Sequence, residues 1–317
     1  MDVIYFVAQQ TMIFTIPLLI VALGGMFSER CGIVNIALEG IMTIGAFTGI
    51  LFISLTGGTL SGQLQLAIAI VIAMVSGGIF SLFHAYAAIH MKADQTISGT
   101  ALNMFAPAFA IFVARMIFGV QQVVFTNTFR ISEVPLLGKI PVIGPMFFRN
   151  TYSTTYLGIV ILIVSSVFLY RTKIGLRLRA CGEHPGAADA AGVSVRKMQY
   201  LGVILSGVLA GVGGLVYVIP TSTNFNATVS GYGFLAVAVL IFGQWKPSRI
   251  LLAALFFGVT KAVASSYSGI PELAALGIPS YVYKMIPYLA TLVALIFTSR
   301  KSQAPRALGI PYDKGTR

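Results

Sequence analysis

The chain has few charged residues for its length. Only 9% of its 317 residues are charged, whereas ordinary globular domains carry roughly 25%. Hydrophobic residues make up 57%, and several apolar runs of about 20 residues are long enough to cross the hydrocarbon core of a bilayer. This composition excludes an ordinary soluble domain. It predicts an all-α polytopic membrane protein with about 9–10 transmembrane helices.

The sequence also lacks the motifs of common hydrolytic and metal sites. Its two cysteines, Cys31 and Cys181, offer neither a disulfide framework nor a cysteine cluster for zinc. It contains no G-x-x-x-x-G-K-[ST] phosphate-binding loop, no H-E-x-x-H and no G-x-S-x-G, and its three histidines are scattered. We therefore predict no catalytic residues, no metal site and no cofactor in this chain. An integral membrane enzyme is the weakest of the function classes considered.

Basic residues are concentrated in three segments. The loop 171–199, the connection 246–249 and the region after residue 299 hold 13 of the 21 lysines and arginines. The positive-inside rule places these segments in the cytosol, which explains the net charge of +12 better than nucleic-acid binding does. The C-terminus is then cytosolic and the proline-containing loop 120–153 is external. Nine crossings place the N-terminus outside, whereas a re-entrant helix near 24–40 would return it to the cytosol.

We predict a single transmembrane domain over residues 1–298 and a cytosolic C-terminal tail over 299–317. Within the domain, glycines and polar residues interrupt the apolar pattern at 24–40. Gly32 and Gly40 permit a helix break, and irregular backbone at membrane depth is tolerated only inside protein or along a watery cavity. The segment therefore predicts a discontinuous helix beside a translocation path. No matching break is apparent in the second half of the chain.

Several polar side chains lie inside the apolar spans, where such residues are functional candidates. Glu39 either contacts a solute or serves as an ion-pair partner or cap at the helix break. Lys261 lies about seven residues, or roughly 10 Å, from the outer end of its span, so we expect it to extend to the outer interface. Asn103 can form an interhelical hydrogen bond. The predicted path residues are Asn35, Glu39, Asn103, Tyr217, Phe225 and Tyr232, with Asn224, Asn226 and Tyr267 as further neutral contacts.

The polar loop 171–199 contains a short predicted helix. Pro185 suits the first helical position, the alanines that follow favour a helix, and Gly192 suits its C-terminal stop. A helix this short is marginal alone. It needs a surface to pack against, either on this chain or on a partner, unless it is an incidental turn in a surface loop.

Three well-separated stretches resemble the permease subunits of bacterial ABC importers. They are GGMFSERCGIVNIALEGIMTIGAF, LRACGEHPGAADAAGVSV and GYGFLAVAVLIFGQWKPSRILLAALFFG. The chain is similar to the branch that serves branched-chain amino acids, ribose and nucleosides, and within it most similar to nucleoside permeases of the guanosine and uridine type. The resemblance implies a subunit that forms the translocation path and leaves nucleotide hydrolysis to a separate ATPase.

The resemblance also implies partners. In such permeases an alanine-rich turn docks into a groove on the cytosolic ABC ATPase, which would carry ATP and Mg. A second homologous permease chain and an extracellular substrate-binding lipoprotein would complete the importer in the lipid of the bacterial cytoplasmic membrane, with no nucleic-acid partner. The docking residues it implies are Glu183, His184, Pro185, Ala187, Ala188, Ala191 and Gly192.

Two alternatives for the function stay open at this point. One is a ribose or branched-chain amino-acid permease of the same family. Neutral hydrogen-bonding and aromatic side chains suit nucleosides or sugars better than zwitterions, which need charge compensation. The other is a self-sufficient secondary transporter, for which broken helices would be expected in both halves. Lys261 has no place in the family pattern.

Overall fold

The computed structural model describes residues 2–57, 59–267, 278–298 and 303–314. It confirms an all-α membrane fold, in which seven helices are long and apolar enough to cross a membrane and α9 is a shorter apolar helix. The helices are α1 (Asp2–Arg30), α2 (Leu38–Leu55), α3 (Gly62–Ile89), α4 (Gln95–Phe118), α5 (Ser153–Arg171), α6 (Lys173–Glu183), α7 (Pro185–Ala190), α8 (Val195–Thr221), α9 (Tyr232–Phe242), α10 (Pro247–Ser266) and α12 (Ser280–Thr298).

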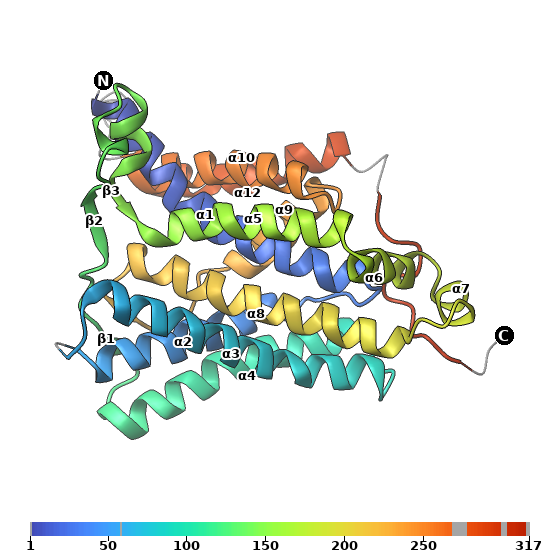
Figure 1. Cartoon of the computed structure of the whole chain (residues 1–317). Helices are drawn as coiled ribbons and strands as arrows, with labels where there is room; N and C mark the ends of the chain where they lie inside the picture. Colours follow the sequence, from blue (N-terminus) through green and yellow to red (C-terminus); the bar gives the residue numbers. More distant parts are fainter. Residues whose placement is uncertain (1, 58, 268–277, 299–302, 315–317) are drawn as a thin grey trace.

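The long helices lie side by side along one axis, with α1 in the middle (Figure 1). The apolar part of α1 is 89% buried and that of α8 is 78% buried, whereas α4 is only 17% buried. Helix α8 packs against α1, α2 and α3. These four helices form the core of the protein, and α4 lies at its edge.

Small residues set the close packing of α8. A methyl group on Gly211 would overlap the carbonyl oxygen of Ala73 in α3, and one on Gly45 of α2 would overlap Gly211 itself. In a membrane there is no hydrophobic driving force between helices, because lipid tails are as apolar as the side chains. Helices therefore associate largely through van der Waals packing, which close backbone approach at small residues permits. The glycines of α8 therefore form a packing face against α2 and α3.

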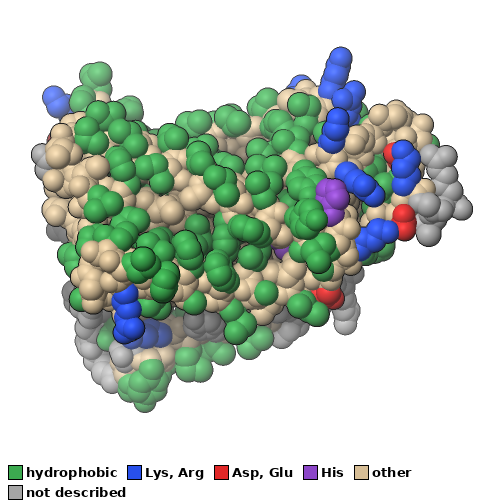
Figure 2. All heavy atoms as spheres, turned by 90° about the horizontal axis from the view of Figure 1, so that it is seen from below, with side chains coloured by type: hydrophobic (Ala, Val, Ile, Leu, Met, Phe, Trp, Pro, Cys, Tyr) green, Lys and Arg blue, Asp and Glu red, His purple; other side chains and the backbone are tan. Residues whose placement is uncertain are grey.

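The two ends of the helical body differ in structure and charge. One end carries two short antiparallel pairs, β1 (Val123–Val124) with β4 (Asn224–Phe225) and β2 (Arg130–Glu133) with β3 (Arg149–Tyr152). The other end carries α6, α7 and the C-terminal residues, and the two termini lie at opposite ends (Figure 1). Figure 2 shows most of the visible Lys and Arg side chains gathered at this second end, with hydrophobic side chains along the middle. We call it the basic end.

Candidate translocation and coupling sites

The first helix break lies at residues 31–37, as the sequence predicts. Helix α1 ends at Arg30 in the basic end, the chain reverses at Gly32 (φ +96°), and α2 begins at Leu38. Because α2 runs antiparallel to α1, the irregular residues form the start of the second crossing. Asn35 is only 1% exposed, and its Nδ2 donates to Ser206 Oγ of α8 at 2.8 Å. The break is therefore buried within the protein.

Side chains from neighbouring helices satisfy the backbone of this break. Gln95 Oε1 accepts from the Val34 N–H at 2.7 Å, and His84 Nε2 lies 2.8 Å from the Val34 carbonyl oxygen. A carbonyl oxygen can only accept, so His84 Nε2 carries the proton. Asn103 Nδ2 donates to the Ile36 carbonyl at 2.8 Å, while its Oδ1 accepts from the Gly40 N–H at 2.7 Å. These bonds replace the helical ones that the break lacks.

Two predicted path residues, Asn35 and Asn103, thus hold the break in shape. Asn35 Oδ1 also accepts from the Ala37 N–H at 3.1 Å at the start of α2. Sequence reasoning missed His84 and Gln95 as partners of this segment. An intramembrane histidine was the available signal, but its fully buried position in α3 depends on the tertiary fold.

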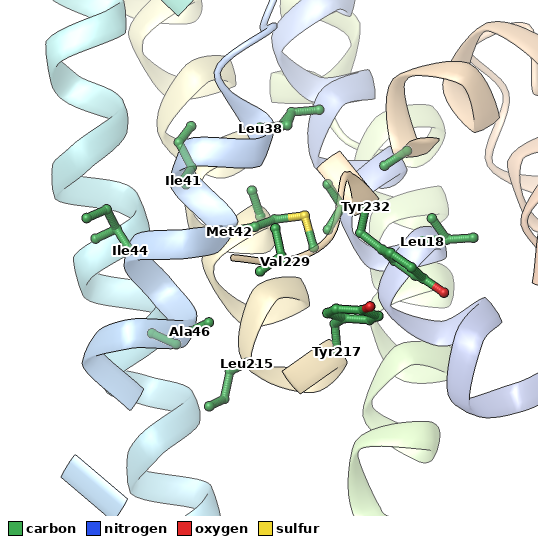
Figure 3. Close-up of a cluster of buried hydrophobic side chains, with 14 of the residues drawn as sticks. Leu18, Leu38, Ile41, Met42, Ile44, Ala46, Leu215, Tyr217, Val229 and Tyr232 are labelled. Carbon is green, nitrogen blue, oxygen red and sulfur yellow. The ribbon is translucent and has the colours of Figure 1, made fainter. Parts of the chain in front are cut away.

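A second break precedes α9, and the prediction of no matching break in the second half was wrong. After α8 the chain forms β4 at the end opposite the basic end, and residues 226–231 then lead to α9. Val229 is fully buried, and Figure 3 shows it among the core side chains near Met42. Gly231, with φ +77°, is the N-cap residue directly before α9. Helix α9 spans only 11 residues, so it is a half-helix.

Glu39 joins the two breaks. Its Oε1 accepts from the Gly231 N–H at 2.8 Å, and its Oε2 accepts from the Gly233 N–H at 2.6 Å. A carboxylate there satisfies two free N–H groups at the N-terminus of α9 and interacts favourably with its dipole. Gly233 also permits the contact, because a methyl group there would overlap the Glu39 backbone. Among the roles predicted for Glu39, the structure therefore shows the helix cap. The helix that Glu39 caps is α9.

The aromatic residues that were predicted to line the path gather around the second break. The Tyr217 and Tyr232 rings lie 3.9 Å apart between centroids and face each other in Figure 3. Phe225 is 2% exposed, with its ring 6.4 Å from that of Phe47. A cavity of about 220 Å³ lies on one side of the break and is lined by Tyr217, Val218, Thr221, Ser222, Asn224, Phe225, Asn226, Thr228 and Ser230.

A second cavity, of about 440 Å³, lies between α9, α10 and α12. It is lined by Ser230, Gly231, Tyr232, Phe234, Leu235, Ala238, Lys261, Pro287, Thr291 and Leu292. Ser230 is thus shared by both cavities. Tyr267, the remaining neutral candidate, stacks on Tyr283 at 4.5 Å and lines neither cavity.

The predicted short helix in the polar loop is present as α7. His184 precedes it and accepts the Ala187 N–H at Nδ1 (3.1 Å), while Gly192 follows it with φ +81°. Glu183, His184, Ala187, Ala191 and Gly192 are exposed, and Pro185 is partly exposed. Ala188 instead is buried against Cys181 and Val195. Burial also raises the pKa of the Cys181 thiol to about 11.

Residues 303–314, which we call the C-terminal strap, bind along the basic end. The Ala307 N–H donates to the Gly182 carbonyl at the end of α6 (2.9 Å), and the Gly309 N–H donates to the Gly32 carbonyl in the first break (3.0 Å). Tyr312 packs on the cluster under Ala188. The described part of the predicted tail thus bridges α7 and the first break.

The end of α1 makes a parallel connection. Arg30 donates through Nη2 to the Trp245 carbonyl at 2.9 Å, and its Nη1 lies 3.7 Å from Glu183 Oε1. Trp245 Nε1 in turn donates to Glu29 Oε2 at 2.6 Å. The residues between α9 and α10 are therefore fixed to both α1 and the start of the α7 region.

Comparison with known proteins places the chain in a family. The family model described as "Branched-chain amino acid transport system / permease component" matches residues 7–295. The guanosine ABC transporter permease NupQ of Bacillus subtilis is 42% identical, over 100% of this chain and 99% of its own length. The nucleoside ABC transporter permease NupC of Lactococcus lactis is 40% identical, over 97% and 96%. A second nucleoside ABC permease of that organism, NupB, is 24% identical, over 95% and 82%.

Proposed function

The chain belongs to the branched-chain amino acid transport system permease family, and we propose that it is the transmembrane permease subunit of an ATP-driven importer for nucleosides. The observation that supports nucleosides as the substrates is the similarity to two permeases named for guanosine and nucleosides. Each is at least 40% identical to this chain over almost its full length. As a permease subunit of an ABC transporter, the chain is not itself an enzyme. The separate ATPase would bind ATP and Mg.

The ATPase would dock on α7 and the residues beside it. His184, Ala187, Ala191 and Gly192 offer a small, exposed and mostly uncharged surface, which suits insertion into a groove. Ala188 would act indirectly, because its side chain seats α7 on Cys181 and Val195. The basic end would then face the cytosol, in keeping with the positive-inside rule.

Movement of the docked ATPase would reach the membrane through the contacts of the basic end. A displacement of α7 pulls on α6 and on the strap, and the strap is hydrogen-bonded to Gly32 in the first break. Glu39, just beyond that break, holds the N-terminus of α9. The two breaks would therefore shift together and open the path alternately to either side. Tyr217, Phe225 and Tyr232 would line this path around the second break.

A second permease chain would complete the pore, and an external binding protein would deliver the solute. Lactococcus lactis has two nucleoside permeases that both resemble this chain, which favours a heterodimer. Helix α4 has the least buried apolar face of the described spans, with Met104 and Met116 more than 70% exposed. This face is our candidate for the contact with the second permease.

Uptake by cells tests the proposal. In a bacterium lacking its own nucleoside uptake, the chain is expressed with its ATPase, second permease and binding protein. We expect ATP-dependent uptake of labelled guanosine or uridine, and co-purification of the ATPase in mild detergent. Uptake of ribose or leucine in place of nucleosides would establish the alternative permeases of the family. Uptake by the chain without any ATPase would establish a secondary transporter.

A further inference from the structure

We infer that the 440 Å³ cavity between α9, α10 and α12 is a solute-binding site in which Lys261 donates to a carbonyl oxygen of an aromatic base. The inference rests on the proposed function and adds to it a residue and a chemical preference. The volume falls within the roughly 300–1,000 Å³ typical of small-molecule sites. The wall combines the aromatic rings of Tyr232 and Phe234 with the hydroxyl-bearing residues Ser230 and Thr291.

The contacts described so far give Lys261 no structural role. It lies 14 residues into α10, or about 21 Å along the helix from the basic end. Its Nζ lies 5.6 Å from the centre of the Tyr232 ring, so it does not extend to the outer interface as predicted. Among the described residues, no carboxylate or hydrogen-bond acceptor pairs with it. A lysine inside a span is costly and marks a solute or ion pathway.

Tyr232, whose ring lies beside Lys261, carries a second polar group without a described partner. The residue is 1% exposed, and its hydroxyl has no hydrogen-bond partner in the described part of the chain. Buried hydroxyls normally have partners, and exceptions call for an explanation such as strain or a bound water. The hydroxyl has no accessible surface in the cavity, so the group that the cavity itself offers is the Lys261 cation, next to the aromatic side chains of its wall.

These groups favour one class of solute. Aromatic side chains stack on any base, since every base has a π face. The ammonium group of Lys261 has three donors and no acceptor, so it selects for acceptors. Guanine, hypoxanthine and uracil each carry a carbonyl oxygen, whereas adenine offers only ring nitrogens. We therefore expect a preference for bases that carry a carbonyl group over adenine.

The position of the cavity connects binding to movement. Ser230 and Gly231 form part of its wall, and Gly231 is held by Glu39 across the two breaks. Ser230 also lines the 220 Å³ cavity on the other side of the second break. A displacement of this break would thus change both cavities at once, which is what transfer of a solute between two openings requires.

The test compares Lys261→Met with Lys261→Arg in the complete importer, reconstituted in proteoliposomes. The control is Lys284→Met, which removes an exposed lysine of α12 outside the cavity. We expect Lys261→Met to lower ATP-driven uptake of guanosine and inosine about tenfold, as loss of a charged hydrogen bond does. Adenosine uptake should fall less, and arginine should restore most of the activity.

The outcomes separate this inference from the proposed function. Normal guanosine uptake by Lys261→Met would overturn the inference alone, and would leave the cavity to a lipid chain. An equal loss for guanosine and adenosine that arginine does not restore would also overturn it, because it indicates a structural role. Basal ATPase activity of each variant shows that the complex has assembled. If the unmodified importer moves no nucleoside at all, the proposed function fails and this inference with it.

Discussion

Replacing Glu39 by Gln should break the link between the two helix breaks. The carboxylate accepts two backbone N–H groups at 2.8 and 2.6 Å, whereas the amide has a single acceptor oxygen. One N–H at the start of α9 would then face an NH₂ group. A charged hydrogen bond contributes about 1.5–3 kcal/mol, and the helix dipole adds about 0.3–1 kcal/mol. The substitution should therefore cost about 2–4 kcal/mol in the stability of this arrangement.

Two readouts measure the effect in the purified complex. We expect a melting temperature lower by several degrees and nucleoside uptake reduced at least tenfold, with the ATPase still bound. The matched control is Glu133→Gln, which alters an exposed carboxylate 3.5 Å from Arg149 at the far end of the molecule. Surface pairs of this kind contribute about 0–1 kcal/mol, so both readouts should stay near those of the unmodified protein. If Glu39→Gln also matches the unmodified protein, the two bonds neither stabilise α9 nor couple the two breaks.

Three further experiments test the basic end and the orientation. Gly192→Asp should abolish uptake and ATPase co-purification without affecting membrane insertion. The control is Gly119→Asp, at a glycine of the opposite end that is equally open and also left-handed, and it should preserve both uptake and co-purification. Equal effects of the two substitutions would refute docking at α7. Ala307→Pro removes the N–H that binds Gly182 and should lower uptake while the ATPase stays bound. Arg306→Ala beside it is the control, and normal uptake by Ala307→Pro would show that the strap transmits nothing. With the buried native cysteines kept, an impermeant maleimide should label Ser132→Cys but not Arg306→Cys in intact cells, and the reverse would invert the topology.

Features coded locally were predictable from the sequence. Pro185 and Gly192 mark the two ends of a short helix through their own backbone preferences, and the structure has that helix as α7. Gly32, with Asn35 and Glu39 close by, likewise indicated the first break. Polar residues within an apolar span need hydrogen-bonding partners, so they signal an irregular segment in the sequence itself.

The second break could not be predicted in the same way. Residues 222–231 read as an ordinary polar loop after a long helix. Their place inside the protein depends on Glu39, about 190 residues earlier in the chain, and on the core contact of Val229. The same holds for His84, whose partners come from the break and from α4. Such pairings depend on how the whole helical bundle packs, so a local sequence pattern cannot predict them.

The C-terminal strap has a consequence for biosynthesis. It follows all of the described helices in the sequence, so the ribosome makes it after them. Until then the carbonyl groups of Gly32 and Gly182 lack the N–H partners that the strap gives them. The underside of the first break and the seat of α7 are therefore completed last. A chain released without the strap would carry the described membrane helices but an incomplete form of the surface proposed to bind the ATPase, so assembly could distinguish chains with the strap from chains that lack it.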